Sequence, residues 1–154
     1  KRENHYKTIF KKHLETVPCK SKILLSFGEI DCRHDEGICS HYLKTDILLD
    51  KIIERTVNGF LNFLLDASVK KNLELIFMGV HAPVLNKNVD EGIRKLQLDI
   101  IKKWNKILKE KLALTNHRFI ETYEITSNQD GYSNKKYMID NTHLSSSILR
   151  KLII

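Results

Sequence analysis

Short apolar segments alternate along this chain with long amphipathic ones, and this alternation restricts the possible folds more than any other feature. The apolar segments are residues 23–27, 73–80 and 118–123. The first two are brief and almost entirely apolar, and the loops that follow them contain Gly28 or Pro83, as is typical of parallel strands buried on both faces. The third follows the Asn116-His117 turn. We therefore predict three strands at these positions.

The segments around the predicted strands carry apolar residues at steps of three and four positions. Residues 4–15, 46–70 and 90–114 have this spacing, and a short final helix is predicted from Leu144 onward. Such spacing indicates amphipathic helices that bury one face. Strands that alternate with long helices imply right-handed βαβ crossovers and a parallel sheet. We therefore predict an α/β fold, with a three-layer α/β/α architecture, for a single domain over residues 1–154.

Charge and cysteine content narrow the classes of partner. Lys and Arg exceed Asp and Glu by 26 to 19, which gives a formal charge of +7. The basic residues are dispersed and not interleaved with aromatic residues, so we expect a solvated surface and no nucleic-acid partner. No apolar run reaches the ~18 residues of a membrane-spanning helix, and residues 1–12 are too charged for a signal peptide. The 3 cysteines, an odd number, indicate reduced thiols, and we expect a cytoplasmic protein without a membrane partner.

Polar side chains gather in the loops that follow the predicted strands. Residues 28–34 follow the first strand, His81 follows the second, and Asp140 and His143 lie downstream of the third. Ligands of open parallel sheets bind beyond the carboxyl ends of the strands. We therefore expect these loops to share one edge of the molecule and to hold the functional site.

Asp140 and His143 are separated by three positions, which lets a carboxylate orient an imidazole within one turn. In such a pair the carboxylate fixes the tautomer of the ring, and the other ring nitrogen takes a proton from a nucleophilic hydroxyl. The alternative is purely structural, with Asp140 as a helix N-cap and His143 on the surface of the first turn.

The position of this pair resembles a block of the SGNH (GDSL-like) hydrolase family. That family carries Asp-x-x-His after its last strand and before its final helix, and a Gly-x-Asn-Asp block at the end of a central strand. Here Asp140-Asn141-Thr142-His143 and Gly28-Glu29-Ile30-Asp31 occupy these places. The stretch from Phe27 to Arg33 is similar to a variant of the second block.

The resemblance implies a flavodoxin-like sheet and a Ser-His-Asp esterase or deacetylase that acts on a small-molecule or carbohydrate ester. It implies that Asp140 orients His143, that His143 is the general base, and that no metal or organic cofactor takes part. It further implies that Gly28, Glu29, Asp31 and Arg33 lie near the oxyanion and acyl site. His81 is added to this region because its loop follows a strand at the same edge of the sheet.

Two departures from the family pattern bear on activity. The Gly-Asp-Ser block with the nucleophile is absent, so we expect it, together with the N-terminal strands of the sheet, to precede Lys1. Ser26 lies inside a predicted strand, and residues 145–147 are too close to His143 to serve. Ile30 replaces the family's Asn, which removes an oxyanion donor typically worth ~3 kcal/mol, unless Arg33 replaces it. A non-catalytic binding or scaffolding domain is therefore the alternative function.

Other residues around the first loop have competing explanations. Asp31 would anchor the loop by accepting backbone N–H bonds, and Glu29 and Arg33 would either pair with each other or face a ligand. His81 would face a substrate or bond to the backbone. Zinc binding is disfavoured because each pair of candidate ligands is separated by a single residue; these candidates are Cys32, His34, Cys39 and His41.

Overall fold

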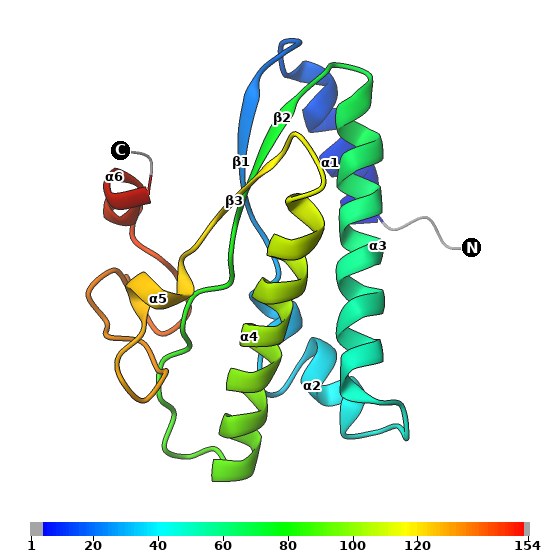
Figure 1. Cartoon of the computed structure of the whole chain (residues 1–154). Coiled ribbons are helices and arrows are strands. Elements are labelled where there is room, and N and C mark those ends of the chain that lie inside the picture. The colour runs from blue at the N-terminus through cyan, green and yellow to red at the C-terminus, as the bar shows by residue number, and fades with distance from the viewer. Residues whose placement is uncertain (1–4, 153–154) are drawn as a thin grey trace.

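The computed structural model describes residues 5–152 of the chain (Figure 1). Strands and helices alternate as the sequence predicts. In chain order the elements are α1 (His5–Thr16), β1 (Lys22–Ser26), the 3-10 helix η1 (Ile30–Cys32), α2 (Gly37–Tyr42), α3 (Leu49–Val69), β2 (Glu74–Met78), α4 (Glu91–Leu112), β3 (Arg118–Ile120), α5 (Tyr123–Thr126), the 3-10 helix η2 (Ser146–Ile148) and α6 (Leu149–Leu152).

The strands form one parallel sheet in the order β1-β2-β3. Leu24 of β1 lies opposite Ile76 of β2, and Ile76 lies opposite Arg118 of β3. The prediction that these strands are parallel neighbours is confirmed. The prediction that β1 is buried on both faces is wrong, because only Leu25 is fully buried and β1 is an edge strand of this sheet.

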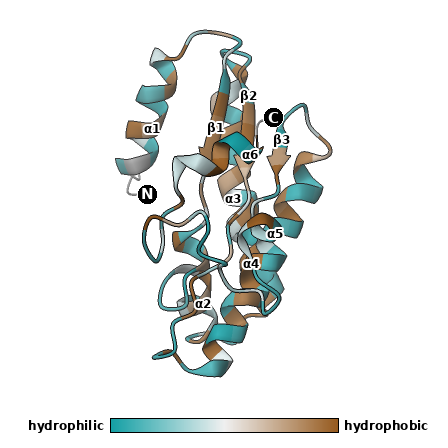
Figure 2. Cartoon of the chain, turned by 90° about the vertical axis from the view of Figure 1, so that its left-hand side faces the viewer, coloured by the Kyte–Doolittle hydropathy of each residue, from teal (hydrophilic) through white to brown (hydrophobic). Residues whose placement is uncertain are grey.

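Helices cover both faces of the sheet, so the α/β/α prediction is also confirmed. Leu75 and Phe77 of β2 belong to one buried cluster with Val57 of α3 and Trp104 of α4. On the opposite face, Met78 packs with buried side chains of the C-terminal segment, namely Tyr137 and Ile148. Figure 2, which looks onto this second face, shows α6 in front of the strands. The layer that contains α3 and α4 is thick, and the layer formed by the C-terminal segment is thin.

Two strands end earlier than predicted, because side chains replace the strand ladder at their carboxyl ends. Val80 N donates to Asn105 Oδ1 at 2.7 Å, and Asn105 Nδ2 donates to Val80 O at 2.8 Å. The Thr122 hydroxyl donates to Gly79 O. Residues 79–80 therefore leave β2, and Tyr123 begins a helix rather than ending β3.

Helix bounds differ from the predictions by a few residues. Helix α3 begins at Leu49 and not at residue 46, and no side chain caps it, because residues 43–48 form turns. Helix α4 begins as predicted, and Asp90 Oδ1 accepts from Ile93 N at 3.2 Å as its N-cap. The final helix begins at Leu149 rather than Leu144, which pairs with Met138 in an antiparallel bridge. No helix within residues 5–152 has the length and apolar character needed to cross a membrane.

Candidate active site

Asp140 and His143 lie at the two ends of a tight loop. Met138 and Leu144 form the bridge that closes the loop, and Ile139 N donates to His143 O at 2.8 Å. The next helical turn, η2, is capped by Ser145, whose Oγ accepts from Ser147 N at 3.2 Å. Asp140 is therefore not the cap of a helix, and this part of the structural alternative is wrong.

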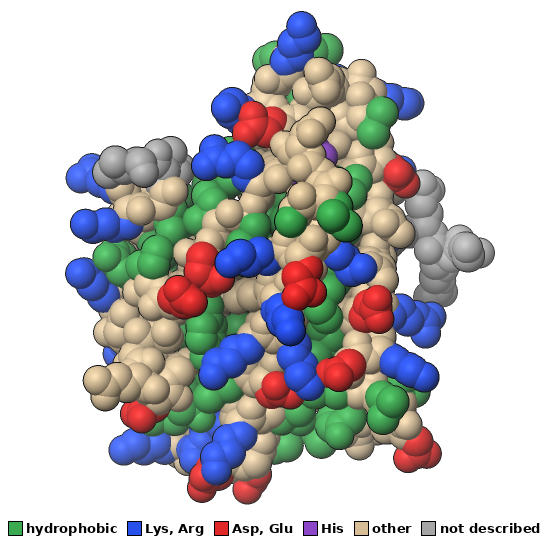
Figure 3. All heavy atoms as spheres, viewed as in Figure 1, with side chains coloured by type: hydrophobic (Ala, Val, Ile, Leu, Met, Phe, Trp, Pro, Cys, Tyr) green, Lys and Arg blue, Asp and Glu red, His purple; other side chains and the backbone are tan. Residues whose placement is uncertain are grey.

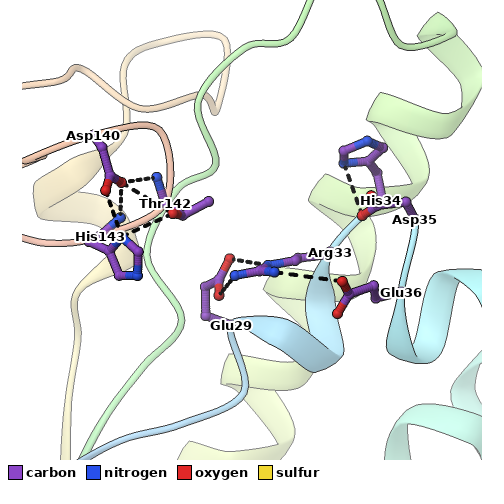
Figure 4. Close-up of polar contacts among 8 residues, drawn as sticks. All are labelled: Glu29, Arg33, His34, Asp35, Glu36, Asp140, Thr142 and His143. Atoms are coloured by element: carbon purple, nitrogen blue, oxygen red, sulfur yellow. Dashed lines mark hydrogen bonds and ion pairs between the residues drawn. The ribbon is translucent and has the colours of Figure 1, made fainter.

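The carboxylate of Asp140 holds both the loop and the imidazole (Figure 4). Its Oδ2 lies 2.7 Å from His143 Nδ1. Its Oδ1 accepts the N–H groups of Thr142 and His143, both at 2.7 Å, and the Thr142 hydroxyl at 3.1 Å. The His143 side-chain bond, followed by the backbone bonds, holds the pKa of Asp140 well below its ordinary range.

This geometry determines which nitrogen of His143 is available for chemistry. An ionised carboxylate only accepts hydrogen bonds, so Nδ1 must carry the hydrogen that points to Asp140. Nε2 is then the basic nitrogen. Both side chains are exposed, His143 by 70% and Asp140 by 52%, and within residues 5–152 no hydroxyl is hydrogen-bonded to Nε2. Ser26 is exposed, contrary to prediction, but lies in the ladder opposite Met78 rather than at a turn.

The loop after β1 turns sharply at Gly28. This residue has a φ of +95°, and a Cβ there would lie 2.7 Å from the ring of Trp104. Only glycine fits both the positive φ and the close approach. Around this turn, Phe27 and Asp31 line one hollow of the molecule, whereas Glu29 and Arg33 line another.

Glu29 and Arg33 form a two-bond ion pair (Figure 4). Arg33 Nε donates to Glu29 Oε1 at 2.9 Å, and Arg33 Nη2 donates to Glu29 Oε2 at 2.8 Å. The third nitrogen, Nη1, is 3.7 Å from a carboxylate oxygen of Glu36. Of the two explanations for this pair, mutual pairing is the one observed. The Arg33 guanidinium is therefore already engaged in this structure and is a poor replacement for the missing Asn.

Asp31 lies away from the other predicted site residues. It borders the groove between α1 and α3, and within the described chain no backbone N–H donates to its carboxylate. Burial without such partners raises the pKa of Asp31. The prediction that Asp31 anchors the loop through backbone bonds is wrong. Asp31 lies within η1 and does not line the cavity that Glu29 and Arg33 line, and its role in a substrate region stays a prediction.

His81 connects the loop after β2 to the Asp140–His143 loop. Its ring is buried, and the backbone of Thr142 lies near enough to favour the protonated form of the ring. Burial is the main cause that lowers the pKa of His81, while the nearby charge of Glu29 raises it and that of His143 lowers it. His81 thus lies within electrostatic range of both predicted groups, and both of its predicted roles, backbone bonding and a place at the site, are compatible with this position.

A cavity of about 530 Å³ brings these segments together. Glu29, Arg33 and His81 line it, and the Asp140–His143 loop contributes Asn141 and Thr142. Three basic side chains that no sequence motif indicated also line the cavity, namely Lys87, Arg94 and Lys135.

Two polar residues that hold this edge in place were also missed. Asn105 is buried and bonds both backbone groups of Val80. The Thr126 hydroxyl accepts from Ala82 N at 3.0 Å. A signal existed for Asn105, because an amide next to Trp104 on the buried stripe of an amphipathic helix needs a partner.

The four candidate zinc ligands do not come together. Cys32 and Cys39 are buried in the core, and burial raises the pKa of both thiols. His34 lies 3.8 Å from Asp35, and His41 borders the groove between α1 and α3. In residues 5–152, no three His, Cys, Asp or Glu side chains form a group suited to a metal ion.

Comparisons with known proteins support the fold. No protein-family model and no curated protein sequence matches the chain. A structure from Streptococcus pneumoniae, assigned provisionally as a platelet activating factor, has a similar fold with a TM-score of 0.56 and 15% identity, over 92% of this chain and 61% of the other. A structure from Bacteroides fragilis, assigned provisionally as an acylhydrolase, has a TM-score of 0.56 and 12% identity, over 98% of this chain and 96% of the other. The chain thus spans less than two thirds of the first protein and nearly all of the second, and the similarity supports its α/β fold with a parallel sheet flanked by helices.

Proposed function

We propose that this chain supplies the general base of an SGNH-type ester hydrolase with a Ser-His-Asp mechanism. The observation that carries the proposal is the 2.7 Å contact between Asp140 Oδ2 and His143 Nδ1, which leaves Nε2 as the open basic nitrogen. One of the two proteins of similar fold is assigned as an acylhydrolase, which agrees with ester chemistry. The substrate we propose is a small-molecule or carbohydrate ester, and the reaction a deacylation.

In this mechanism His143 Nε2 takes the proton of a serine hydroxyl as that oxygen attacks the ester carbonyl. Asp140 keeps Nδ1–H in place and stabilises the imidazolium that forms. His143 then returns the proton to the leaving alcohol, and the acyl-enzyme is hydrolysed with His143 as base for water. Because no hydroxyl of residues 5–152 bonds Nε2, we propose that the serine lies outside residues 1–154.

The oxyanion donors are part of the same proposal. Ile30 has no donor in its side chain and is 58% exposed, while Arg33 is bonded to Glu29. The donors are therefore backbone N–H groups or groups outside this chain. The presence of Ile30 at the position of the donor Asn also favours the second candidate function, a binding or scaffolding domain without catalysis.

The test is acyl-enzyme formation on p-nitrophenyl acetate. The natural protein that contains this chain should give a burst of p-nitrophenol, and His143→Ala should lower the rate by ~10²–10⁴-fold because the general base is lost. His13→Ala is the matched control, since it removes another exposed histidine, one on α1. The 154-residue chain alone should not exceed the rate of free imidazole.

Two results would contradict the proposal. Undiminished activity of the His143→Ala protein would remove the proposed base. Serine-type turnover by the 154-residue chain alone would place the nucleophile inside it. A natural protein with no esterase activity on any ester would favour the binding function.

A further inference from the structure

The charge that lines the 530 Å³ cavity is not balanced. Four basic side chains border it, Arg33, Lys87, Arg94 and Lys135, against a single carboxylate, Glu29. Arg33 forms two hydrogen bonds with that carboxylate, at 2.9 and 2.8 Å. Glu29 is thus already compensated, and the other three cations face the cavity without an acidic neighbour in it.

Some basic residues on other parts of the surface form ion pairs with acidic side chains. On the face of α3 and α4 in Figure 3, basic and acidic side chains are intermixed. Lys103 lies 2.7 Å from Asp50 and 3.1 Å from Asp99, and Lys111 lies 4.0 Å from Glu54. By contrast, within residues 5–152 no carboxylate is within ion-pair distance of Lys87, Arg94 or Lys135. The chain as a whole is basic, with a formal charge of +7; the cavity is distinguished because three cations without an ion pair share the lining of one hollow.

Arg94 is the best placed of the three cations. It projects from the first turns of α4, is half-buried, and donates from Nη1 to Asn86 O at 3.2 Å. Its Nε is buried and has no hydrogen-bond partner. A buried donor without an acceptor is costly. Because Nε itself is buried, an anion in the cavity would bond the outer nitrogens of the guanidinium, of which only Nη1 has a partner among the described residues.

Neutral hydrogen-bonding groups line the same cavity. They are the side chains of Asn88, Gln97, Tyr132 and Asn141. Within the described chain, none of these side chains makes a hydrogen bond to another protein group. Amide and phenol groups placed in this way suit a ligand with several hydroxyl groups.

We infer that the cavity binds a hydroxyl-rich alcohol with an anionic substituent, such as an acidic sugar, and that Arg94 is the residue that selects for its charge. As a substrate class this rests on the proposed hydrolase function: the sugar would be the alcohol part of the ester, with its acylated hydroxyl toward His143. The anionic group, a carboxylate, sulfate or phosphate, would lie toward Arg94, Lys87 and Lys135.

The first experiment measures binding and needs no catalysis. Glucuronate, glucose 6-sulfate, glucose 6-phosphate and glucose are titrated into the 154-residue chain by calorimetry. At least one charged sugar should bind about tenfold more tightly than glucose, and Arg94→Gln should remove that advantage. The tightest of the three charged sugars identifies the anion. Lys87→Gln and Lys135→Gln, which remove exposed side chains, should each weaken binding by a few-fold.

Lys95→Gln is the matched control for Arg94→Gln. Lys95 is the next residue of α4, carries the same charge, and lies 2.6 Å from Glu91 rather than in the cavity. If Lys95→Gln weakened binding as much as Arg94→Gln, net charge alone would explain the effect and the inference would be wrong. Equal affinity for glucose and for all three charged sugars would also overturn it.

The second experiment separates this inference from the proposed function. The natural protein is given acetylated glucose and the acetylated form of the charged sugar that binds best, and kcat/KM is compared. A preference for the charged ester that Arg94→Gln abolishes supports both ideas. Charge-dependent binding without hydrolysis of either ester supports the ligand class and contradicts the hydrolase. Hydrolysis of both esters at equal efficiency supports the hydrolase and contradicts the inference.

Discussion

Two hollows on opposite sides of the Gly28 turn differ in almost every physical respect. The cavity beside His143 is lined by loops and polar side chains. The groove between α1 and α3 is about twice as large, with a volume of about 1090 Å³, and aromatic side chains dominate it. Phe27 lies at its centre, with ring centroids 5.7 Å from Phe10 and 5.4 Å from Phe60.

The larger of the two hollows has fewer groups suited to chemistry than the smaller one, which borders the candidate site. The groove holds a single carboxylate, Asp31, and no base within hydrogen-bond distance of it. The smaller cavity has an oriented imidazole in the loop beside it, the Glu29–Arg33 ion pair, and three cations that form no ion pair within residues 5–152. The groove is assembled from the sides of helices, whereas the cavity is assembled from strand ends whose backbone is held by Asn105 and Thr126. Backbone fixed in this way is what a catalytic site requires.

The largest expected effect is a difference in stability between two phenylalanines, one in the core and one in the groove, that both contact Phe60 of α3. Phe77 is 1% exposed in the core, so Phe77→Ala should lower the free energy of unfolding by about 3–5 kcal/mol. Phe27 is 40% exposed in the groove, so Phe27→Ala should cost only about 1 kcal/mol. Urea unfolding of both variants measures the difference. Equal losses would break the comparison, since they would mean that Phe27 is covered in solution.

Gly28→Ala should disturb both hollows at once, because the turn at this residue separates them. A Cβ at φ +95° would lie 2.7 Å from Trp104, and we expect a loss of roughly 2–4 kcal/mol in the free energy of unfolding. Gly59→Ala is the control, since a Cβ there has open space in α3 and should stabilise the helix slightly. A Gly28→Ala protein as stable as the wild type would show that the turn adapts and does not fix the two sides.

The sequence predicted the positions of the helices and strands better than the positions of side chains in the loops between them. Periodicity located α3, α4 and all three strands, because apolar spacing is a local property of the chain. The side on which Asp31 lies was not predictable, since it depends on the 3-10 helix η1 that follows the Gly28 turn. The early end of β2 depends on Asn105 and Thr122, which bond the backbone of Val80 and Gly79 directly after this strand. Both residues are distant from β2 in the sequence.

For the candidate site, spacing was sufficient where the contacts are local and insufficient where they are not. Asp140 and His143 are three residues apart, and their contact was predicted correctly. The cations at positions 87, 94 and 135 come from three separate segments, which only the folded chain brings to one cavity. Dispersed basic residues in the sequence gave no indication of this clustering.

The smallest expected effect is a change of stability with pH that is caused by protonation of His81, a residue of the cavity lining. Burial lowers the pKa of His81 below its ordinary value of 6.5. Below pH 6.5, His81 is therefore protonated to a greater extent in the unfolded chain than in the folded chain. Stability should therefore be fully present above pH 6.5 and should fall as the pH is lowered toward the folded-state pKa, by at most ~1.4 kcal/mol per pH unit for one group. His81→Gln should flatten this slope in urea unfolding measured between pH 5 and 7. His117, whose Nδ1 accepts from Leu75 N at 3.1 Å and whose pKa is also lowered by burial, contributes in the same direction, so the double variant with His117→Gln should flatten the slope further. A slope unchanged by His81→Gln would mean that this histidine is protonated equally in the folded and unfolded chain, and that its ring is not buried against the Thr142 backbone in solution.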